Sequence, residues 1–225
     1  MTIDDLIKLY ENKKKKFGTK AYMCISEIFK EAKEKHKKFA LMKGLNDSEQ
    51  SWRAFKGKNL EKLIEYIIVD SVRELGLEII NGNKLERTTR LSKEMDILKR
   101  NLCINYGEFG MHLPDVDMVI YKPNDLKVIA VISSKVTLRE RVAQTGYWKL
   151  KFLQSQVTKH IKVFFITLDE DKTLLIKSPT KKGRAICEVD TDGCYILTND
   201  EVETSDKVKL FSNFIEDLKK LTKLH

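Results

Sequence analysis

The sequence predicts an α/β fold in which a mixed sheet of about five strands is flanked by helices and follows a helical N-terminal region. Three observations predict it. Apolar residues recur at helical spacing over much of residues 2–75. Residues 113–135 contain two β-branched runs separated by Pro123-Asn124-Asp125, the pattern of a β-hairpin. After a helical segment, residues 161–168 (IKVFFITL) form an apolar run that predicts a buried strand parallel to its neighbour.

The N-terminal region, taken as residues 1–57, is expected to be helical. Residues 2–17 show one apolar face, with Thr2 as a candidate cap and Gly18 as a stop signal. A second helix is expected over residues 21–43. A third is expected over residues 59–75, at the start of the second domain, which is taken as residues 58–225.

Shorter elements follow the third helix. The expected strands lie at residues 77–81, 103–106, 173–176, 185–189 and 194–197, and the expected helices at 92–102, from near 138, and at 205–224. Ser92 has the position of a helix cap, and Asp192-Gly193 has the composition of a hairpin turn. Residues 107–112 are expected to form a flexible loop before the hairpin.

The composition favours a polyanionic partner. The chain has 42 Lys and Arg against 33 Asp and Glu, a formal charge of +9. Nucleic acid is the partner class that such a balance favours. A lysine-rich proteome or a thermophilic source would produce the same excess, so charge alone does not establish DNA binding.

The cysteines and the hydropathy pattern bound the compartment. The four cysteines have no CxxC spacing, which favours free thiols in a reducing compartment over disulfides or a zinc site. No secretory apolar segment opens the chain, and no apolar run approaches the roughly 20 residues that span a bilayer. A cytoplasmic protein is therefore expected.

The hairpin at residues 113–135 brings polar residues together. With the turn centred near Asn124, Asp117 is expected opposite Val131, and Asp115 opposite Ser133. Side chains alternate along a strand, so Asp115, Asp117, Ser133 and Lys135 are expected on one face. Two carboxylates, a hydroxyl and an amine suit a divalent cation with an ammonium near a phosphate or an attacking water.

These residues resemble the PD-(D/E)XK nuclease core, in which an aspartate precedes one strand and an acidic-x-Lys motif ends the next. The string ISSKVTLRERVAQ, with YWK after it, is similar to type II restriction endonucleases of that superfamily. The resemblance covers roughly residues 58–166 and is tightest over 114–150. It implies a PD-(D/E)XK nuclease fold for the predicted α/β domain.

The sequence departs from this pattern at Ser133, which stands where the acidic residue before x-Lys is expected. Either another carboxylate supplies the missing ligand, or the site is weakened or lost. On a helical wheel Glu61 lies at the flank of the apolar sector. The resemblance agrees with this placement, because in many such nucleases a glutamate on the helix before the sheet joins the metal site. Glu65 and Glu140 are the other candidates, and pairing with nearby lysines is the structural alternative for Glu61 and Glu65.

The resemblance implies Mg²⁺-dependent hydrolysis of double-stranded DNA at a short palindromic site, leaving 5′-phosphate and 3′-hydroxyl ends. Asp117, with Asp115 as its rival, would bind the metal with Glu61 and a main-chain carbonyl near Ser134. Lys135 would act on the attacking water, and Ser133 completes the candidate catalytic set. Asp117 is favoured over Asp115 because it directly precedes the apolar strand.

Candidate DNA contacts surround this site. Arg139, Arg141 and Gln144 lie one to two turns beyond Lys135, where phosphates or base edges would be in reach, although a salt-bridged surface is the alternative for the arginines. Met42 has the position of a wedge into a base step, with packing at the helix end as its alternative. The remaining candidates are Lys43, Arg53, Lys56, Lys58 and His112.

The resemblance also implies a homodimer whose two-fold axis matches a palindrome, a prokaryotic cytoplasmic setting, and a cognate DNA methyltransferase without a stable complex. Two alternatives stay open. One is a structure-specific repair or junction-resolving nuclease with the same core, and the other is a basic DNA-binding module whose nuclease site has degenerated.

Overall fold

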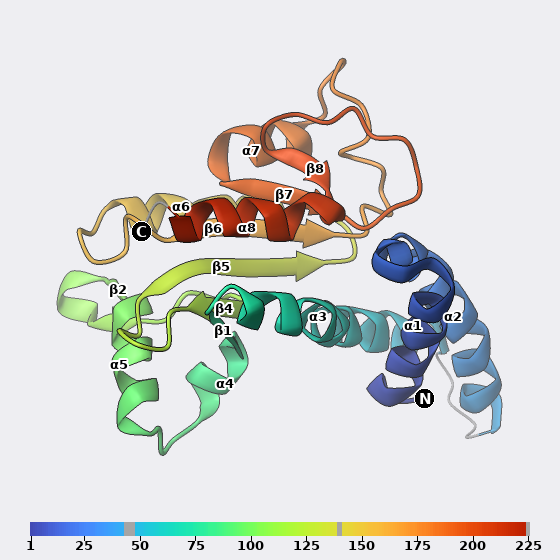
Figure 1. Ribbon diagram of the computed structural model, residues 1–225, viewed down its shortest axis with the longest axis horizontal. Helices are drawn as coiled ribbons and strands as arrows, with labels where there is room; N and C mark the ends of the chain where they lie inside the picture. The colour runs from blue at the N-terminus through green and yellow to red at the C-terminus, as the bar shows by residue number, and fades with distance from the viewer. Residues whose placement is uncertain (43–47, 139–140, 224–225) are drawn as a thin grey trace.

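A computed structural model describes residues 1–42, 48–138 and 141–223 (Figure 1). At its centre is a mixed sheet of six strands in the order β1-β4-β5-β6-β7-β8. Strands β1, β4 and β5 pair antiparallel, whereas β5 to β8 pair parallel. The strands are β1 (Glu78–Asn81), β4 (Met118–Tyr121), β5 (Val128–Lys135), β6 (Lys162–Thr167), β7 (Gly193–Ile196) and β8 (Val208–Leu210).

Helices cover both faces of this sheet, which confirms the predicted α/β architecture. Helices α3 (Ser48–Glu74) and α8 (Phe214–Lys223) share one core with residues such as Ile132 of β5. Helices α5 (Lys93–Leu102) and α6 (Arg141–Leu153) share another core with Val131, and α7 (Lys182–Asp190) packs with β6, β7 and β8. Because the central strands are buried on both faces, their sequences read as continuous apolar runs.

The N-terminal helices lie beyond the carboxyl ends of β5 and β6 (Figure 1). Helix α1 (Ile3–Phe17) begins after Thr2 as predicted. The second helix, expected from residue 21, starts later because η1 (Gly18–Cys24) is a 3-10 helix, and α2 (Ile25–Met42) follows it. Leu6, Ile28 and Trp52 share a core with Met118 of the sheet.

The third helix is longer than predicted. It was expected over residues 59–75, but α3 runs continuously from Ser48 to Glu74, so the boundary at 57/58 falls inside a helix. Its N-terminal half packs against α2, where Trp52 lies near Phe29 with ring centroids 6.3 Å apart, and its second half packs on the sheet. The functional division between residues 1–57 and 58–225 stays a prediction.

The predicted hairpin is confirmed, with a different register. Val119, and not Asp117, lies opposite Val131. The connection is longer than a tight turn: Lys122 N–H donates to the Lys127 carbonyl at 2.9 Å, and the register shifts between Ile120 and Tyr121. Because the pairing slides by two residues, the side chains of the residues paired between the two strands keep their predicted faces.

The region after β6 (Lys162–Thr167) differs most from the prediction. Residues 185–189 lie in helix α7, and residues 173–176 contain no strand. The Asp192-Gly193 pair connects this helix to β7, which runs parallel to β6, so it is not a hairpin turn. The helix predicted over residues 205–224 is preceded by β8 and η3 (Phe211–Asn213), and α8 begins only at Phe214.

The elements between β1 and β4 are short. Helix α4 (Gly82–Arg87) follows β1, and Ser92 caps α5 as predicted, accepting from Met95 N–H at 3.3 Å. The strand expected over 103–106 is β2 (Ile104–Asn105). Residues 107–112, expected as a flexible loop, contain η2 (Gly107–Phe109) and β3 (Met111–His112), which pairs with β2.

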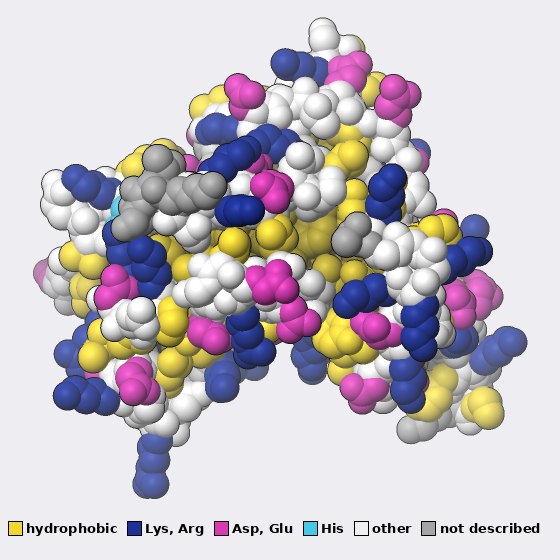
Figure 2. Space-filling view, viewed as in Figure 1, with side chains coloured by type: hydrophobic (Ala, Val, Ile, Leu, Met, Phe, Trp, Pro, Cys, Tyr) yellow, Lys and Arg dark blue, Asp and Glu magenta, His cyan; other side chains and the backbone are white. Residues whose placement is uncertain are grey.

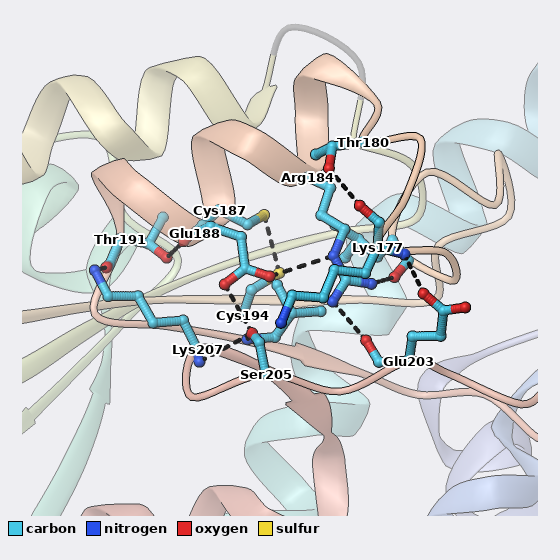
Figure 3. A network of polar contacts seen from close by, with 12 residues as sticks. Lys177, Thr180, Arg184, Cys187, Glu188, Thr191, Cys194, Glu203, Ser205 and Lys207 are labelled. Carbon is cyan, nitrogen blue, oxygen red and sulfur yellow. Dashed lines mark hydrogen bonds and ion pairs between the residues drawn. The ribbon is translucent and has the colours of Figure 1, made fainter.

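A buried arginine forms hydrogen bonds with several segments of the C-terminal part of the chain (Figure 3). Arg184 of α7 is fully buried and donates to the carbonyl oxygens of Leu174 and Glu203. It also contacts Glu188 at 3.3 Å, and Glu188 accepts from Ser205 at 2.7 Å. Two irregular segments are thereby bound to one helix.

Among the residues that the structure describes, no helix combines the length and the apolar character needed to cross a membrane.

Candidate active site

Asp117 directly precedes β4 and is held by several main-chain groups. The residue is buried, and its Oδ2 accepts hydrogen bonds from Ser134 N–H at 2.6 Å and Ser134 Oγ at 3.3 Å. Its own N–H donates to Ile132 O at 3.0 Å, and its carbonyl accepts from Gly82 N–H at 2.9 Å. Asp117 is therefore held from two segments of the chain, by β5 through its side chain and main chain and by Gly82 through its main chain.

Lys135 ends β5 and points at this carboxylate. Its Nζ lies 3.1 Å from Oδ1 and 2.9 Å from Oδ2 of Asp117. The lysine side chain is 33% exposed and that of Asp117 is 9% exposed. The pair thus has a solvent-facing ammonium over a buried carboxylate, at the carboxyl end of the longest strand.

Glu61 of α3 is the second carboxylate at this place. It is half-buried, and its Oε1 accepts a hydrogen bond from Nδ2 of Asn81 at the end of β1. Burial raises the pKa of Glu61, and the negative charge of Asp117 raises it further, whereas Asn81 and Lys135 act in the opposite direction. The two carboxylates are close enough to repel each other, a repulsion that a divalent cation between them would relieve.

Asp115 and Ser133 do not join this group. Asp115 is exposed, and its Oδ2 accepts from Gln144 Nε2 at 2.9 Å. Ser133 is buried beside Phe165 of β6, and it is the next residue, Ser134, that contacts Asp117. Of the four side chains expected together on one face, the structure joins only Asp117 and Lys135. Asp115 lies before β4 begins, so strand alternation does not govern it.

Glu65 and Glu140 are the remaining candidate carboxylates. Glu65 is half-buried one turn further along α3, and burial raises its pKa, while Lys84 and Lys62 lower it. Glu140 lies outside the described residues. Glu61 is therefore the carboxylate that the described structure brings to Asp117.

The donor set suits a hard divalent cation that keeps much of its water. No group of three or more His, Cys, Asp and Glu side chains within the described ranges has the geometry of a metal site. Mg²⁺ is commonly bound through only one or two carboxylates, with water and substrate phosphate completing its shell. Asp117 and Glu61 fit that requirement.

A groove of about 700 Å³ begins directly beyond Lys135. Val136 and Thr137 form one wall, and α2 and α3 form the other. Arg53 and Lys56, both predicted DNA contacts, line it together with Lys30 and Lys33. Lys56 is buried and paired with Glu170, and Lys33 pairs with Glu49 at 2.9 Å. Figure 2 shows Lys and Arg side chains over the N-terminal helices, interspersed with acidic ones.

The other predicted DNA contacts are scattered. Met42 is 84% exposed at the end of α2, so packing at the helix end, the alternative reading, is wrong for its side chain. Lys58 is exposed on α3, and Arg141 is exposed at the start of α6. His112 in β3 is bonded to the carbonyl of Phe109 at 2.8 Å. Lys43 and Arg139 lie outside the described residues.

Sequence reasoning missed three contributors to this region. The sequence patterns predict Asn81 only as the end of an expected strand and assign no role to Gly82, yet these two residues contact Glu61 and Asp117. Lys30 has helical spacing from Lys33, but nothing in the sequence relates either lysine to the end of β5. These contacts join residues far apart in the chain, so only the fold reveals them.

Three comparisons relate the chain to known proteins. Residues 94–217 match the family described as BsaWI restriction endonuclease type 2. A Methanocaldococcus jannaschii protein designated type II restriction enzyme MjaVIP is 40% identical over 184 residues, 80% of this chain and 80% of that protein. A Helicobacter pylori protein designated type II restriction enzyme HpyAORF263P is 40% identical over 125 residues, 56% of this chain and 64% of that protein.

Two solved structures have a similar fold. The restriction endonuclease BsaWI in a pre-specific DNA complex superposes with a TM-score of 0.51 at 18% identity, covering 99% of this chain and 92% of that chain. The restriction endonuclease AgeI in a specific DNA complex superposes with a TM-score of 0.51 at 16% identity, covering 90% of this chain and 82% of that chain. The nuclease fold expected from the resemblance is confirmed. Together with the family match and the relative from M. jannaschii, these findings show that the chain belongs to the BsaWI family of type 2 restriction endonucleases.

Proposed function

We propose that the chain cleaves double-stranded DNA at a short palindromic site with Mg²⁺ as its cation, leaving 5′-phosphate and 3′-hydroxyl ends. The observation that carries the proposal is the contact of Lys135 with the buried carboxylate of Asp117, beside Glu61, in a member of this family. Restriction endonucleases generally use divalent metal ions. Mg²⁺ is the proposed one because the two carboxylates offer hard oxygen ligands.

In this proposal Asp117 and Glu61 would hold the cation, together with the main-chain carbonyl of Ser134. When bound, Mg²⁺ supplies Lewis-acid stabilisation of the charge that develops on the scissile phosphate. The N–H of Ser134 keeps Asp117 in place at 2.6 Å. Asp115 stands outside the ligand set, since Gln144 already holds its carboxylate at the surface. Glu61 takes the part that the acidic residue at the position of Ser133 has in the resembling nucleases.

Lys135 would orient the attacking water and offset negative charge in the transition state. The water oxygen bonds to phosphorus as the bond between phosphorus and the 3′-oxygen breaks. One proton of the water passes to solvent, and the 3′-oxygen takes up a proton to become a hydroxyl. The ammonium lies within reach of this chemistry because it is a third exposed while its carboxylate partner is buried.

The groove beyond Lys135 would hold the DNA backbone near the cleaved phosphate. Lys30 and Arg53 are exposed there and make no salt bridge with any described residue, so both can meet phosphates. Lys56, also predicted as a DNA contact, is largely buried and forms an ion pair with Glu170. It would therefore contribute to the wall of the groove and would not bind phosphate directly.

Contacts from Arg139, Arg141, Gln144, Lys43, Met42, Lys58 and His112, with Ser133 in the catalytic set, stay predictions. A homodimer that matches the palindrome, a prokaryotic cytoplasmic setting and a cognate methyltransferase without a stable complex belong to the same proposal.

The test is to incubate the purified chain with long, unmethylated duplex DNA of known sequence, with Mg²⁺ or with chelator. Discrete Mg²⁺-dependent fragments whose ends accept ligation are expected. Cleavage of branched DNA alone would instead establish a structure-specific nuclease. Salt-sensitive binding without any cleavage would mark a degenerate site.

A further inference from the structure

Asn81, at the carboxyl end of β1, donates its side-chain amide to one of the two carboxylates, Glu61. We infer that Asn81 is a positioning residue, whose side-chain amide holds Glu61 beside Asp117 so that both carboxylates can bind one divalent cation. The inference rests on the proposed function, because it takes Glu61 and Asp117 as the cation ligands.

Strand pairing places Asn81 next to Asp117. Asn81 lies opposite Met118 in the antiparallel pairing of β1 with β4, and Met118 directly follows Asp117. The following residue, Gly82, donates its N–H to the Asp117 carbonyl at 2.9 Å. The main chain at Asn81-Gly82 is therefore tied to the same residue whose carboxylate Lys135 contacts.

The side chain of Asn81 reaches the other carboxylate. Its Nδ2 donates to Oε1 of Glu61, which comes from α3 and not from the sheet. Glutamate has three rotatable side-chain bonds, so without a donor its carboxylate would sample several rotamers. In the part of the chain that the structure describes, Oε2 of Glu61 has no hydrogen-bond partner, which leaves that oxygen for a cation.

At Gly82 the main chain approaches the segment before Asp117 too closely for any side chain. A Cβ on Gly82 would lie 1.9 Å from the carbonyl oxygen of Val116, so only glycine permits the approach of β1 to the segment before Asp117. The Asn81-Gly82 pair thus fixes Asp117 through the main chain and Glu61 through a side chain. Ligating carboxylates that are hydrogen-bonded by a second residue typically lose about 10–100-fold in metal affinity when that residue is removed.

The experiment measures Mn²⁺ binding to the full chain without DNA, by electron paramagnetic resonance. Asn81→Ala and the similarly shaped Asn81→Leu are both expected to bind Mn²⁺ about 10–100-fold more weakly than the unsubstituted chain. Asn83→Ala is the matched control, since Asn83 is an exposed asparagine two residues further on. It should bind Mn²⁺ as the unsubstituted chain does.

A double-mutant cycle separates positioning from a general effect on folding. Because Asn81 acts through Glu61, the variant Glu61→Gln/Asn81→Ala should bind Mn²⁺ no more weakly than Glu61→Gln alone. In DNA cleavage, Asn81→Ala should raise the half-saturating Mg²⁺ concentration about 10-fold or more, with the rate at saturating Mg²⁺ changed by less than about threefold. Metal-free thermal unfolding of each variant verifies folding.

Unchanged Mn²⁺ affinity in a folded Asn81→Ala variant would overturn the inference, as would additive losses in the cycle. So would an unsubstituted chain that does not bind Mn²⁺ at millimolar concentration. Weaker Mn²⁺ binding in Asn81→Ala, in a chain that cleaves no DNA, would sustain the inference while the proposed function fails.

Discussion

The Nζ of Lys135 donates to both carboxylate oxygens of Asp117, at 3.1 Å and 2.9 Å, and so joins the end of β5 to the start of β4. The carboxylate is buried and also bonded to Ser134 N–H, whereas the ammonium remains partly exposed. A cation bound to Asp117 would compete for the same oxygens. Lys135 would then be free to turn toward a phosphate, and the two residues would have separate roles.

Asp117 and Asp115 are expected to differ sharply when substituted. Asp117→Asn keeps the shape of the side chain but weakens a cation ligand, so cleavage should fall at least about 100-fold. Asp115→Asn should retain cleavage within about tenfold, because Asp115 is exposed and held by Gln144. Single-turnover rates at saturating enzyme compare the two. Full activity in Asp117→Asn would refute the choice of Asp117.

Substitutions in the groove are expected to weaken DNA binding without regard to sequence. Lys30→Ala and Arg53→Ala each remove one cation from the wall, so the slope of log affinity against log salt should fall by about 0.9 per substitution. Lys219→Ala on α8, exposed and outside the groove, is the control. Identical salt slopes for all three variants and the unsubstituted chain would place the DNA elsewhere.

Asp169 is expected to make the stability of the fold depend on pH. Burial raises the pKa of this carboxyl from 3.8 to about 6, although the N–H groups of Thr173 and Leu174 donate to it at 2.9 Å. The folded state therefore holds the proton more tightly than the unfolded state. The resulting stabilisation is complete below pH 3.8 and is lost as the pH rises through about 6.

The amide of Asp169→Asn does not titrate, so the stability of this variant does not fall as the pH rises through about 6. Its free energy of unfolding relative to the unsubstituted chain should rise by about 2 kcal/mol between pH 4 and pH 7. If the amide makes weaker hydrogen bonds than the carboxyl group, the free energy of unfolding falls equally at both pH values, so this effect cancels in the comparison. Urea unfolding at the two pH values measures the change, with exposed Asp206→Asn as control. Parallel behaviour of both variants would contradict the burial effect at Asp169.

Arg184 is expected to be a main determinant of stability. Arg184→Met leaves the carbonyl groups of Leu174 and Glu203 without their donor and Glu188 without its cation. The expected loss is about 3–5 kcal/mol of the free energy of unfolding. Lys182→Ala, exposed on the same helix, should change it by less than about 0.5 kcal/mol. A loss below about 1 kcal/mol for Arg184→Met would show that water satisfies these groups.

Local patterns predicted the elements that carry the site. The Pro123-Asn124-Asp125 turn and its β-branched flanks gave the hairpin, and the apolar run at 161–168 gave the parallel strand β6. The position of Glu61 at the edge of the apolar sector, together with the family resemblance, predicted Glu61 as a carboxylate of the site, and the charge of Asp117 does act on it. These predictions succeed because each depends on the periodicity of a single element or on one short connection.

Predictions failed where contacts between distant segments determine the type of an element, its register or its partners. Residues 185–189 have a short apolar run that fits a strand, but Arg184 and Cys187 are buried at a spacing of three, which is helical. The hairpin register depended on the length of the connection, which composition does not specify. Asn81 meets Glu61 across 20 residues of chain, and no local pattern encodes that contact.

The most direct measurement compares Lys135→Ala with the unsubstituted chain on a labelled duplex that carries the mapped cleavage site. The single-turnover cleavage rate should fall at least about 100-fold, because the group that offsets charge in the transition state is gone. The dissociation constant for the duplex, measured with Ca²⁺ in place of Mg²⁺, should change less than about threefold. Lys122→Ala, at the far end of the hairpin, should match the unsubstituted chain in both. A Lys135→Ala variant that cleaves at the unsubstituted rate would contradict the assignment of this site.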